Sequence, residues 1–178
     1  KTWAYLVPAL LGGGKVLVST GTRTLQDQLF SRDLPGVRDA LSIPAVIALL
    51  KGRGNYVCHY HLERQQGEDR ALKSRAEVQQ LRHIQVFAQQ SATGDRADLP
   101  TVPEDAEIWQ RVTSTRENCL GQECPNVRDC FVLKARRQAQ EADVVVINHA
   151  LFMADLVLRD AGVTDLLPAA DTVIFDEA

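Results

Sequence analysis

Long apolar runs are missing from this 178-residue sequence, and so is a strong excess of either charge. There is no run of about eighteen apolar residues and no basic leader followed by an apolar stretch, which argues against a transmembrane helix or a secretory signal. We therefore expect a cytoplasmic protein. With a net charge of -3, any contact with nucleic acid has to be local. A hydrophobic content of 45% still allows a core, in one domain or in one domain with an insertion.

Cysteine is also scarce, with Cys119, Cys124 and Cys130 close together and Cys58 far upstream. Thiols stay reduced in the cytoplasm, so four cysteines favour a metal site or buried thiols over two disulfides. Polar residues surround the group of three, which argues against buried thiols. The pattern therefore predicts a metal site.

The spacing of these thiols bears on which metal they bind. Four residues separate Cys119 from Cys124, and five separate Cys124 from Cys130. Structural zinc sites usually pair cysteines about two to four residues apart, so a wider loop with a distant Cys58 suits an iron-sulphur cluster better. His59 and His61 keep a mixed cysteine and histidine zinc site open, although both can simply be hydrogen-bonded side chains near a helix start.

Four short β-branched segments predict a parallel sheet covered on both faces, and hence an α/β fold. They are Lys15–Thr20, Ala45–Leu50, Asp143–Asn148 and Thr172–Ala178. We expect the core of the sheet to come from Val16–Val18, Val144–Ile147 and Val173–Phe175.

Helical patterns lie between these segments. Residues 2–14 predict a helix ended by glycines, with Pro8 as a kink or an early stop. Residues 23–34 place Leu25, Leu29 and Phe30 on one helical face.

The composition changes between residues 51 and 141, where β-branched segments give way to polar, charged helices. Apolar stripes predict helices over residues 76–90 and 128–140, with a turn-rich loop over residues 91–105. All four cysteines lie in this block. We therefore predict an α/β domain formed by residues 1–50 and 142–178, with a helical insertion at residues 51–141.

The two ends of the chain carry residue types found in P-loop nucleotidases. The sequence begins with Lys1 and Thr2 and ends with an apolar strand that leads into Asp176 and Glu177. In such enzymes the lysine neutralises phosphate charge, the threonine and the aspartate bind magnesium, and a neighbouring glutamate can orient the attacking water. Each piece alone is a weak signal, because the carboxylates after the strand can equally form a capped turn.

Read in order, the motifs resemble the first motor domain of the XPD-like superfamily 2 DNA helicases, in their DinG/YoaA branch and more on the YoaA side. The resemblance rests on "KT", "VLVSTGTRTLQDQL", "KGRGNYVC", the three-cysteine group, "ADVVVINHALF" and "VIFDEA". It implies an ATP-dependent DNA helicase of the DEAH-box type, acting in replication or repair. The implied fold is a RecA-like P-loop domain with a parallel sheet, interrupted by a helical four-cysteine iron-sulphur insertion and ending in the Walker B strand.

The resemblance also implies roles for individual residues. Lys1, Thr2 and Asp176 would hold ATP and magnesium, and Glu177 would orient water. Cys58, Cys119, Cys124 and Cys130 would ligate a 4Fe-4S cluster. Thr20, Thr22 and Gln26 match a DNA-contacting motif, although Thr22 can instead cap a helix. Asn148 and His149 match the family's "NH", which can equally be a turn that starts a helix.

Local charge offers a second route to DNA contact. Residues 51–75 contain six Lys or Arg residues and three Asp or Glu residues. Arg53 in this stretch can bind a phosphate, and Tyr56 can stack on a base of single-stranded DNA. A solvated helix face would show the same charges. Forked or damaged duplex DNA and a replication or repair protein are the further partners that the resemblance implies.

These 178 residues lack three features of the family pattern. They are the phosphate-loop glycines before Lys1, a histidine after Ala178 and a second motor domain. We therefore expect these 178 residues alone to hydrolyse ATP negligibly. Two other functions stay open: a zinc-containing nucleic-acid-binding module without ATPase activity, and a domain that docks onto a repair protein.

Overall fold

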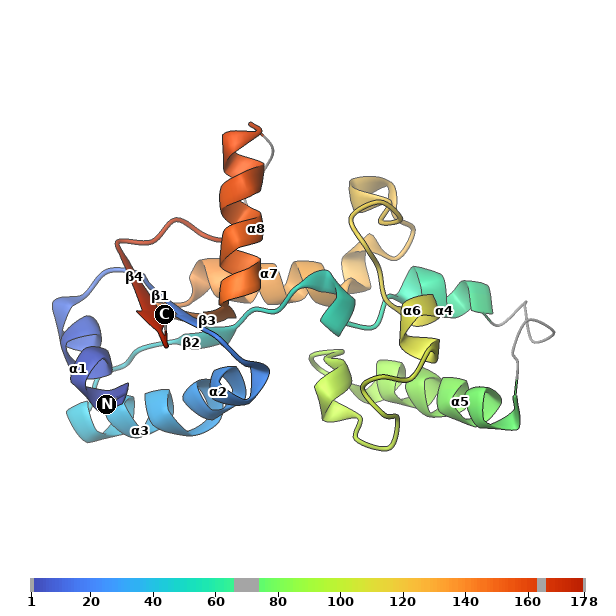
Figure 1. The fold of residues 1–178 in the computed structure, drawn as a ribbon, viewed down its shortest axis with the longest axis horizontal. Helices are drawn as coiled ribbons and strands as arrows, with labels where there is room; N and C mark the ends of the chain where they lie inside the picture. The colour runs from blue at the N-terminus through green and yellow to red at the C-terminus, as the bar shows by residue number, and fades with distance from the viewer. Residues whose placement is uncertain (1, 66–73, 163–165, 178) are drawn as a thin grey trace. The chain divides into compact units, whose positions relative to one another are not determined.

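The computed structural model describes residues 2–65, 74–162 and 166–177. The chain divides into two compact units, with Lys1–Lys51 and Ala135–Ala178 in unit 1 and Gly52–Lys134 in unit 2. Figure 1 shows the elements of each. In these ranges no helix is both long and apolar enough to cross a membrane.

Unit 1 is built on a four-stranded sheet. Its strands are β1 (Val16–Thr20), β2 (Ile47–Leu49), β3 (Val144–Asn148) and β4 (Thr172–Asp176). They are all parallel and lie in the order β2-β3-β1-β4. The predictions of an α/β fold and of a parallel sheet are confirmed.

Helices cover both faces of this sheet (Figure 1). The helices are α1 (Thr2–Gly12), α2 (Arg23–Gln28), α3 (Leu34–Leu41), α7 (Phe131–Glu141) and α8 (His149–Asp160). α1 and α3 pack on one face, whereas α8 contacts β1 and β3 on the other. Pro8 lies inside α1, so the predicted early stop there is wrong. The helix predicted over residues 23–34 is interrupted by a π-helical segment, η1 (Leu29–Asp33).

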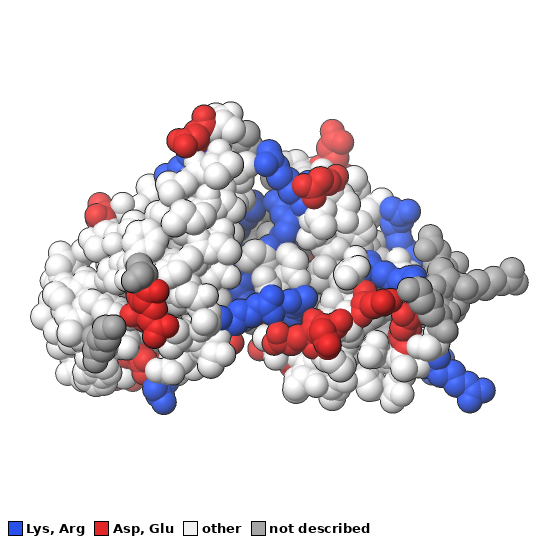
Figure 2. Space-filling model, viewed as in Figure 1, with Lys and Arg blue, Asp and Glu red and all other residues white. Residues whose placement is uncertain are grey.

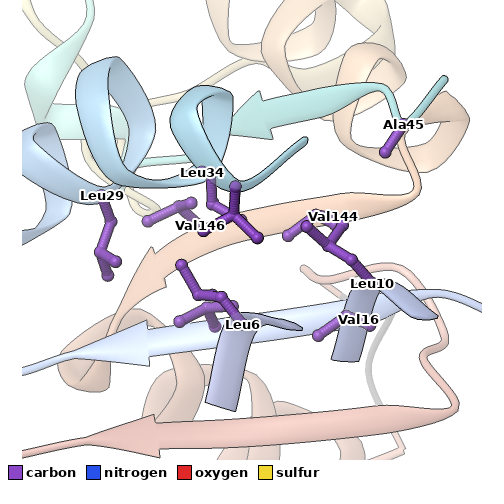
Figure 3. Packing of buried hydrophobic residues seen from close by; sticks show 10 residues of the cluster. Leu6, Leu10, Val16, Leu29, Leu34, Ala45, Val144 and Val146 are labelled. Carbon is purple, nitrogen blue, oxygen red and sulfur yellow. The ribbon is translucent and has the colours of Figure 1, made fainter. Parts of the chain in front are cut away.

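The core of unit 1 forms where α1 and α3 meet the two central strands (Figure 3). Val16 and Val18 from β1 and Val144 and Val146 from β3 are all buried, as predicted. The prediction for β4 is wrong at two positions, because Val173 and Phe175 are 39% and 41% exposed. β4 is an edge strand of the described sheet, so only one of its sides is paired with a neighbour.

Truncation of a core leucine should destabilise unit 1 strongly. Leu34 on α3 is fully buried, so Leu34→Ala should lower the free energy of unfolding by about 2–5 kcal/mol. Leu11→Ala is the matched control, because Leu11 on α1 is 63% exposed. Urea denaturation of both variants tests this. Equal losses of stability in the two variants would contradict the position of the core.

Unit 2 is mainly helical. Its elements are the 3-10 turns η2 (Arg53–Asn55), η4 (Arg96–Asp98), η5 (Gly121–Glu123) and η6 (Val127–Asp129), the helices α4 (His59–Gln65), α5 (Arg75–Gln90) and α6 (Ile108–Val112), and the first residues of α7. α5 buries Leu81, Ile84 and Ala88 on the predicted stripe.

Two local contacts hold the start of unit 2 in place. The Cys58 amide donates to the Val112 carbonyl at 2.7 Å, and Val57 forms an antiparallel bridge with Thr113.

Gly94 lies at φ +64°, and a Cβ atom there would fall 2.2 Å from the Phe131 ring. Glycine is therefore required at this position for both its backbone conformation and its lack of a side chain.

Candidate active site and cysteine site

The carboxyl ends of three strands bring the predicted site residues of unit 1 together. In the sheet register, Thr20 of β1 is paired with Asn148 of β3 on one side and with Asp176 of β4 on the other. Ligands of open α/β sheets bind outside the carboxyl ends of the strands. The register thus places Thr20, at the start of the predicted DNA motif, beside Asp176 at the end of β4.

Tyr5 connects Thr2 with Asp176. Its hydroxyl is buried on α1, one helical turn after Thr2, and has no hydrogen-bond partner of normal geometry among the described residues. Burial, followed by the nearby Asp176 carboxylate, raises the pKa of Tyr5 above its ordinary value, while the Thr2 hydroxyl opposes the rise. The phenol therefore stays neutral, and two of the predicted magnesium ligands lie near one atom. Lys1 lies outside the described residues.

Glu177 follows β4 in an unusual backbone conformation. It is exposed and has φ +58°, in the left-handed region. Such a conformation costs a residue with a side chain roughly 1–3 kcal/mol, and it concentrates at functional sites. This geometry was not predictable from the residue types around Glu177.

His149 and Asn148 occupy the turn between β3 and α8. Asn148 caps α8, since its side-chain oxygen accepts a hydrogen bond from the Leu151 amide at 2.8 Å. His149 has two polar contacts, with the Ser19 hydroxyl at 2.7 Å and with the Asp176 carbonyl at 3.1 Å. Sequence reasoning did not assign a role to Ser19 or Tyr5. Only the spacing of Tyr5, one turn after Thr2, offered a signal.

The three residues of the predicted DNA motif differ in their surroundings. Thr22 is exposed and caps α2, its hydroxyl accepting from the Leu25 amide at 3.2 Å. Thr20 is buried and donates to the Thr22 carbonyl at 3.1 Å. Gln26 is also fully buried and donates to the Leu50 carbonyl at 3.2 Å. Thr22 thus offers an exposed hydroxyl, whereas Thr20 and Gln26 support the loop from within.

The cap at Thr22 can be tested by removing its hydroxyl. Thr22→Ala should lower the free energy of unfolding by about 1 kcal/mol, because the Leu25 amide loses its acceptor. Thr22→Ser retains the hydroxyl and should recover most of this loss. Thermal or urea denaturation measures both variants. If Thr22→Ala is as stable as the parent chain, the hydroxyl does not cap the helix.

Two of the other cysteines, Cys124 and Cys130, lie near enough to Cys58 to affect its thiol. Cys58 is half-buried at the start of α4, and burial raises the pKa of its thiol. Backbone N–H groups of His61 and Tyr60 oppose this rise, whereas Cys124 and Cys130 add to it. Asn126, between these two cysteines, donates to Glu63 of α4 at 2.8 Å. The structure therefore brings the η5–η6 loop towards Cys58.

Cys119 is different, because its side chain is exposed. Within the described ranges, no set of three or more His, Cys, Asp or Glu side chains is arranged as a metal site. All four cysteines are free thiols. Their chemistry, four soft donors within unit 2, fits an iron-sulphur cluster or a zinc ion.

The two histidines after Cys58 have separate environments. The His59 ring packs on Phe131, with 4.7 Å between ring centroids. The buried Nε2 atom of His61 has no hydrogen-bond partner among the residues that the structure describes.

Arg53 and Tyr56 are placed differently from what their predicted DNA contacts need. Tyr56 is only 4% exposed and forms an antiparallel bridge with Asp95, so its ring has little surface for base stacking. Arg53 is half-buried, and its guanidinium donates to the Thr115 carbonyl at 3.5 Å. The face shown in Figure 2 carries both basic and acidic side chains.

Together, the parallel sheet and the residues at its carboxyl edge are consistent with a RecA-like domain. No family model matches the chain. Over its whole length it is 50% identical to the ATP-dependent DNA helicase YoaA of Escherichia coli and 44% identical to the YoaA of Haemophilus influenzae. It is also 36% identical to the ATP-dependent helicase DinG of Mycobacterium tuberculosis, across 199 aligned residues.

These matches extend over the whole of this chain and fit a fragment of a DinG/YoaA protein. It spans 28% of the length of each YoaA relative and 29% of that DinG relative.

Proposed function

We propose that the full-length protein is an ATP-dependent DNA helicase that moves along single-stranded DNA and unwinds duplexes in replication or repair. The observation that carries this proposal is the pairing of Thr20 with Asp176 at the carboxyl edge of one parallel sheet. Relatives in the same family bear the name ATP-dependent DNA helicase, which agrees with this chemistry.

The residues at this edge would have different roles in ATP hydrolysis. The Thr2 hydroxyl and the Asp176 carboxylate would bind magnesium, and Lys1 would hold the phosphates. Magnesium, when bound, neutralises the charge that develops on the β- and γ-phosphates. The exposed Glu177 carboxylate would accept the proton of a water whose oxygen attacks the γ-phosphorus, and ADP would leave.

DNA would bind beside this site. Thr22 is exposed at the start of α2, and its hydroxyl would contact a phosphate of the DNA backbone. Arg53 and Tyr56 stay predictions for DNA contact, and Tyr56 would have to become exposed to stack on a base.

Unwinding of a forked duplex tests the proposal directly. The full-length protein should separate the strands with ATP and magnesium, and it should not separate them with a non-hydrolysable analogue. Strand separation that proceeds equally with the analogue, or that never occurs with ATP on any forked substrate, would contradict the proposal.

We further propose that Cys58, Cys119, Cys124 and Cys130 ligate a 4Fe-4S cluster in unit 2. The electrostatic coupling of Cys58 to Cys124 and Cys130 supports a shared site for three of the four. The cluster, when bound, would cross-link the start of unit 2 to a loop about sixty residues later in the sequence. The exposed Cys119 would be the fourth ligand of the cluster.

A zinc-containing nucleic-acid-binding module is the competing function, and the unpartnered Nε2 of His61 beside Cys58 favours it. Metal and sulphide analysis of anaerobically purified full-length protein separates the two. Iron with an equal amount of inorganic sulphide is expected. One zinc ion without iron would replace the cluster proposal with the zinc module.

A further inference from the structure

His149 joins two strand ends that carry different parts of the proposed function. It is the first residue of α8, directly after β3. Its Nε2 atom lies 3.1 Å from the Asp176 carbonyl of β4, and its Nδ1 atom lies 2.7 Å from the Ser19 hydroxyl of β1. A carbonyl can only accept, so Nε2 carries the proton, and in the neutral ring the Ser19 hydroxyl donates to Nδ1.

Packing holds the His149 ring in this place. The ring lies against Phe175, with 5.8 Å between centroids, and Phe152 of α8 packs edge-on against Phe175 at 4.8 Å. A Cβ atom on Gly21 would come within 3.8 Å of the His149 ring. The half-buried imidazole therefore lies between the loop after β1 and the end of β4.

A hydrogen bond to the Asp176 carbonyl affects the orientation of the next residue, Glu177. The carbonyl belongs to the peptide that joins Asp176 to Glu177, and Glu177 leaves this peptide at φ +58°. Fixing the plane of that peptide fixes the direction in which the Glu177 side chain starts. A hydrogen bond from His149 thus acts on Glu177 through the backbone.

The second hydrogen bond of His149, to Ser19, lies next to the loop that we propose to bind DNA. Ser19 is fully buried and precedes Thr20, whose hydroxyl donates to the Thr22 carbonyl. Ser19 lies in β1 just before this loop, so a shift of the loop that displaces the end of β1 would lengthen the 2.7 Å contact between the Ser19 hydroxyl and Nδ1.

We propose that His149 is a positioning residue that couples the binding of single-stranded DNA at the loop after β1 to the placement of Asp176 and Glu177. This inference rests on the proposed function. The chain of contacts is continuous, running from Thr22 through Thr20 and Ser19 to His149 and the Asp176 carbonyl. Coupling of this kind is a reciprocal free energy between two sites.

The test measures that coupling in the full-length protein at equilibrium. The dissociation constant of a non-hydrolysable ATP analogue with magnesium is determined with and without saturating single-stranded DNA, and the ratio is the coupling factor. We expect a factor of about 5–150 in the parent protein, the usual range for coupled sites. The affinity for DNA should change by the same factor when nucleotide is added.

His149→Phe removes both hydrogen bonds and keeps an aromatic ring against Phe175, so the coupling factor should fall to within about twofold of one. Ser19→Ala keeps the imidazole and removes one arm, and it should give the same loss. His83→Phe, at an exposed position on α5, is the matched control and should keep the parent factor. Thermal denaturation shows whether each variant is folded.

An unchanged coupling factor in folded His149→Phe overturns the inference. If His149→Phe fails to fold, Ser19→Ala decides in the same way. A parent protein that shows coupling, combined with variants that retain it, refutes the role of His149 and leaves the helicase proposal intact. A parent protein without DNA-stimulated ATP hydrolysis and without coupling refutes both.

Discussion

Replacing Glu177 with glutamine in the full-length protein is expected to lower ATP turnover about 10²–10⁴-fold, the usual contribution of a general base. Glutamine is close to glutamate in size but cannot accept a proton from the attacking water. Asp176 and Thr2, which we propose as the magnesium ligands, are untouched. The affinities for ATP and for single-stranded DNA should therefore remain within a few-fold of the parent values. Steady-state hydrolysis and equilibrium binding measure the two effects separately.

The control for this prediction is Glu141→Gln. Glu141 is an exposed glutamate at the end of α7, in a different part of unit 1. The Glu141→Gln variant loses the same charge as Glu177→Gln and should hydrolyse ATP at the parent rate. Normal turnover in Glu177→Gln would remove Glu177 from the mechanism, and loss of ATP binding would show that this carboxylate binds the nucleotide instead.

Replacing Cys58 with serine should cause the second large effect, which is loss of iron, of the brown colour and of unwinding. A hydroxyl is a harder and less easily deprotonated ligand than a thiol, so it binds an iron-sulphur cluster poorly. Cys58 lies directly before α4. Holding it next to the segment Cys119–Cys130, about sixty residues later, closes a long loop, and this costs chain entropy that metal binding would offset. ATP affinity should survive, because the core of unit 1 contains no residue of unit 2.

Iron analysis, visible absorption and an unwinding assay on the same preparation test this expectation. Ala92→Ser places a hydroxyl at an exposed position of unit 2 and should keep its iron. Cys119→Ser is informative in addition, since Cys119 is exposed in the structure and should lose iron only if the cluster has four cysteine ligands. A Cys58→Ser variant with full iron and normal unwinding would refute the cluster proposal.

The sheet was predictable from sequence because its strands are short β-branched segments with few polar residues. Val16, Val18, Val144 and Val146 lie in the core for this reason. Exposure at the sheet edge was not predictable, because the apolar pattern of Val173–Phe175 is the same whether or not a strand has two neighbours. The π-helical segment at Leu29–Asp33 was not predictable either, because the apolar pattern of the sequence does not distinguish it from an α-helix.

The candidate site was predictable in part. The apolar strand before them pointed to Asp176 and Glu177, since polar residues after buried strands lie at one edge of a parallel sheet, whereas Thr22 was found through the family resemblance. The surroundings of each side chain depend on distant segments, and these the sequence does not specify. Gln26 turns inward to the Leu50 carbonyl, Tyr56 is buried, and His149 reaches Asp176 across β1.

The central claim is that the carboxyl edge of the unit 1 sheet hydrolyses ATP in response to DNA. The most direct measurement is the rate of ATP hydrolysis by anaerobically purified full-length protein, with magnesium, in the presence and absence of single-stranded DNA. We expect the rate of hydrolysis to rise when DNA is added, because we propose that bound DNA acts on the placement of Asp176 and Glu177 through His149. A rate that DNA leaves unchanged, or no hydrolysis under either condition, would contradict this claim.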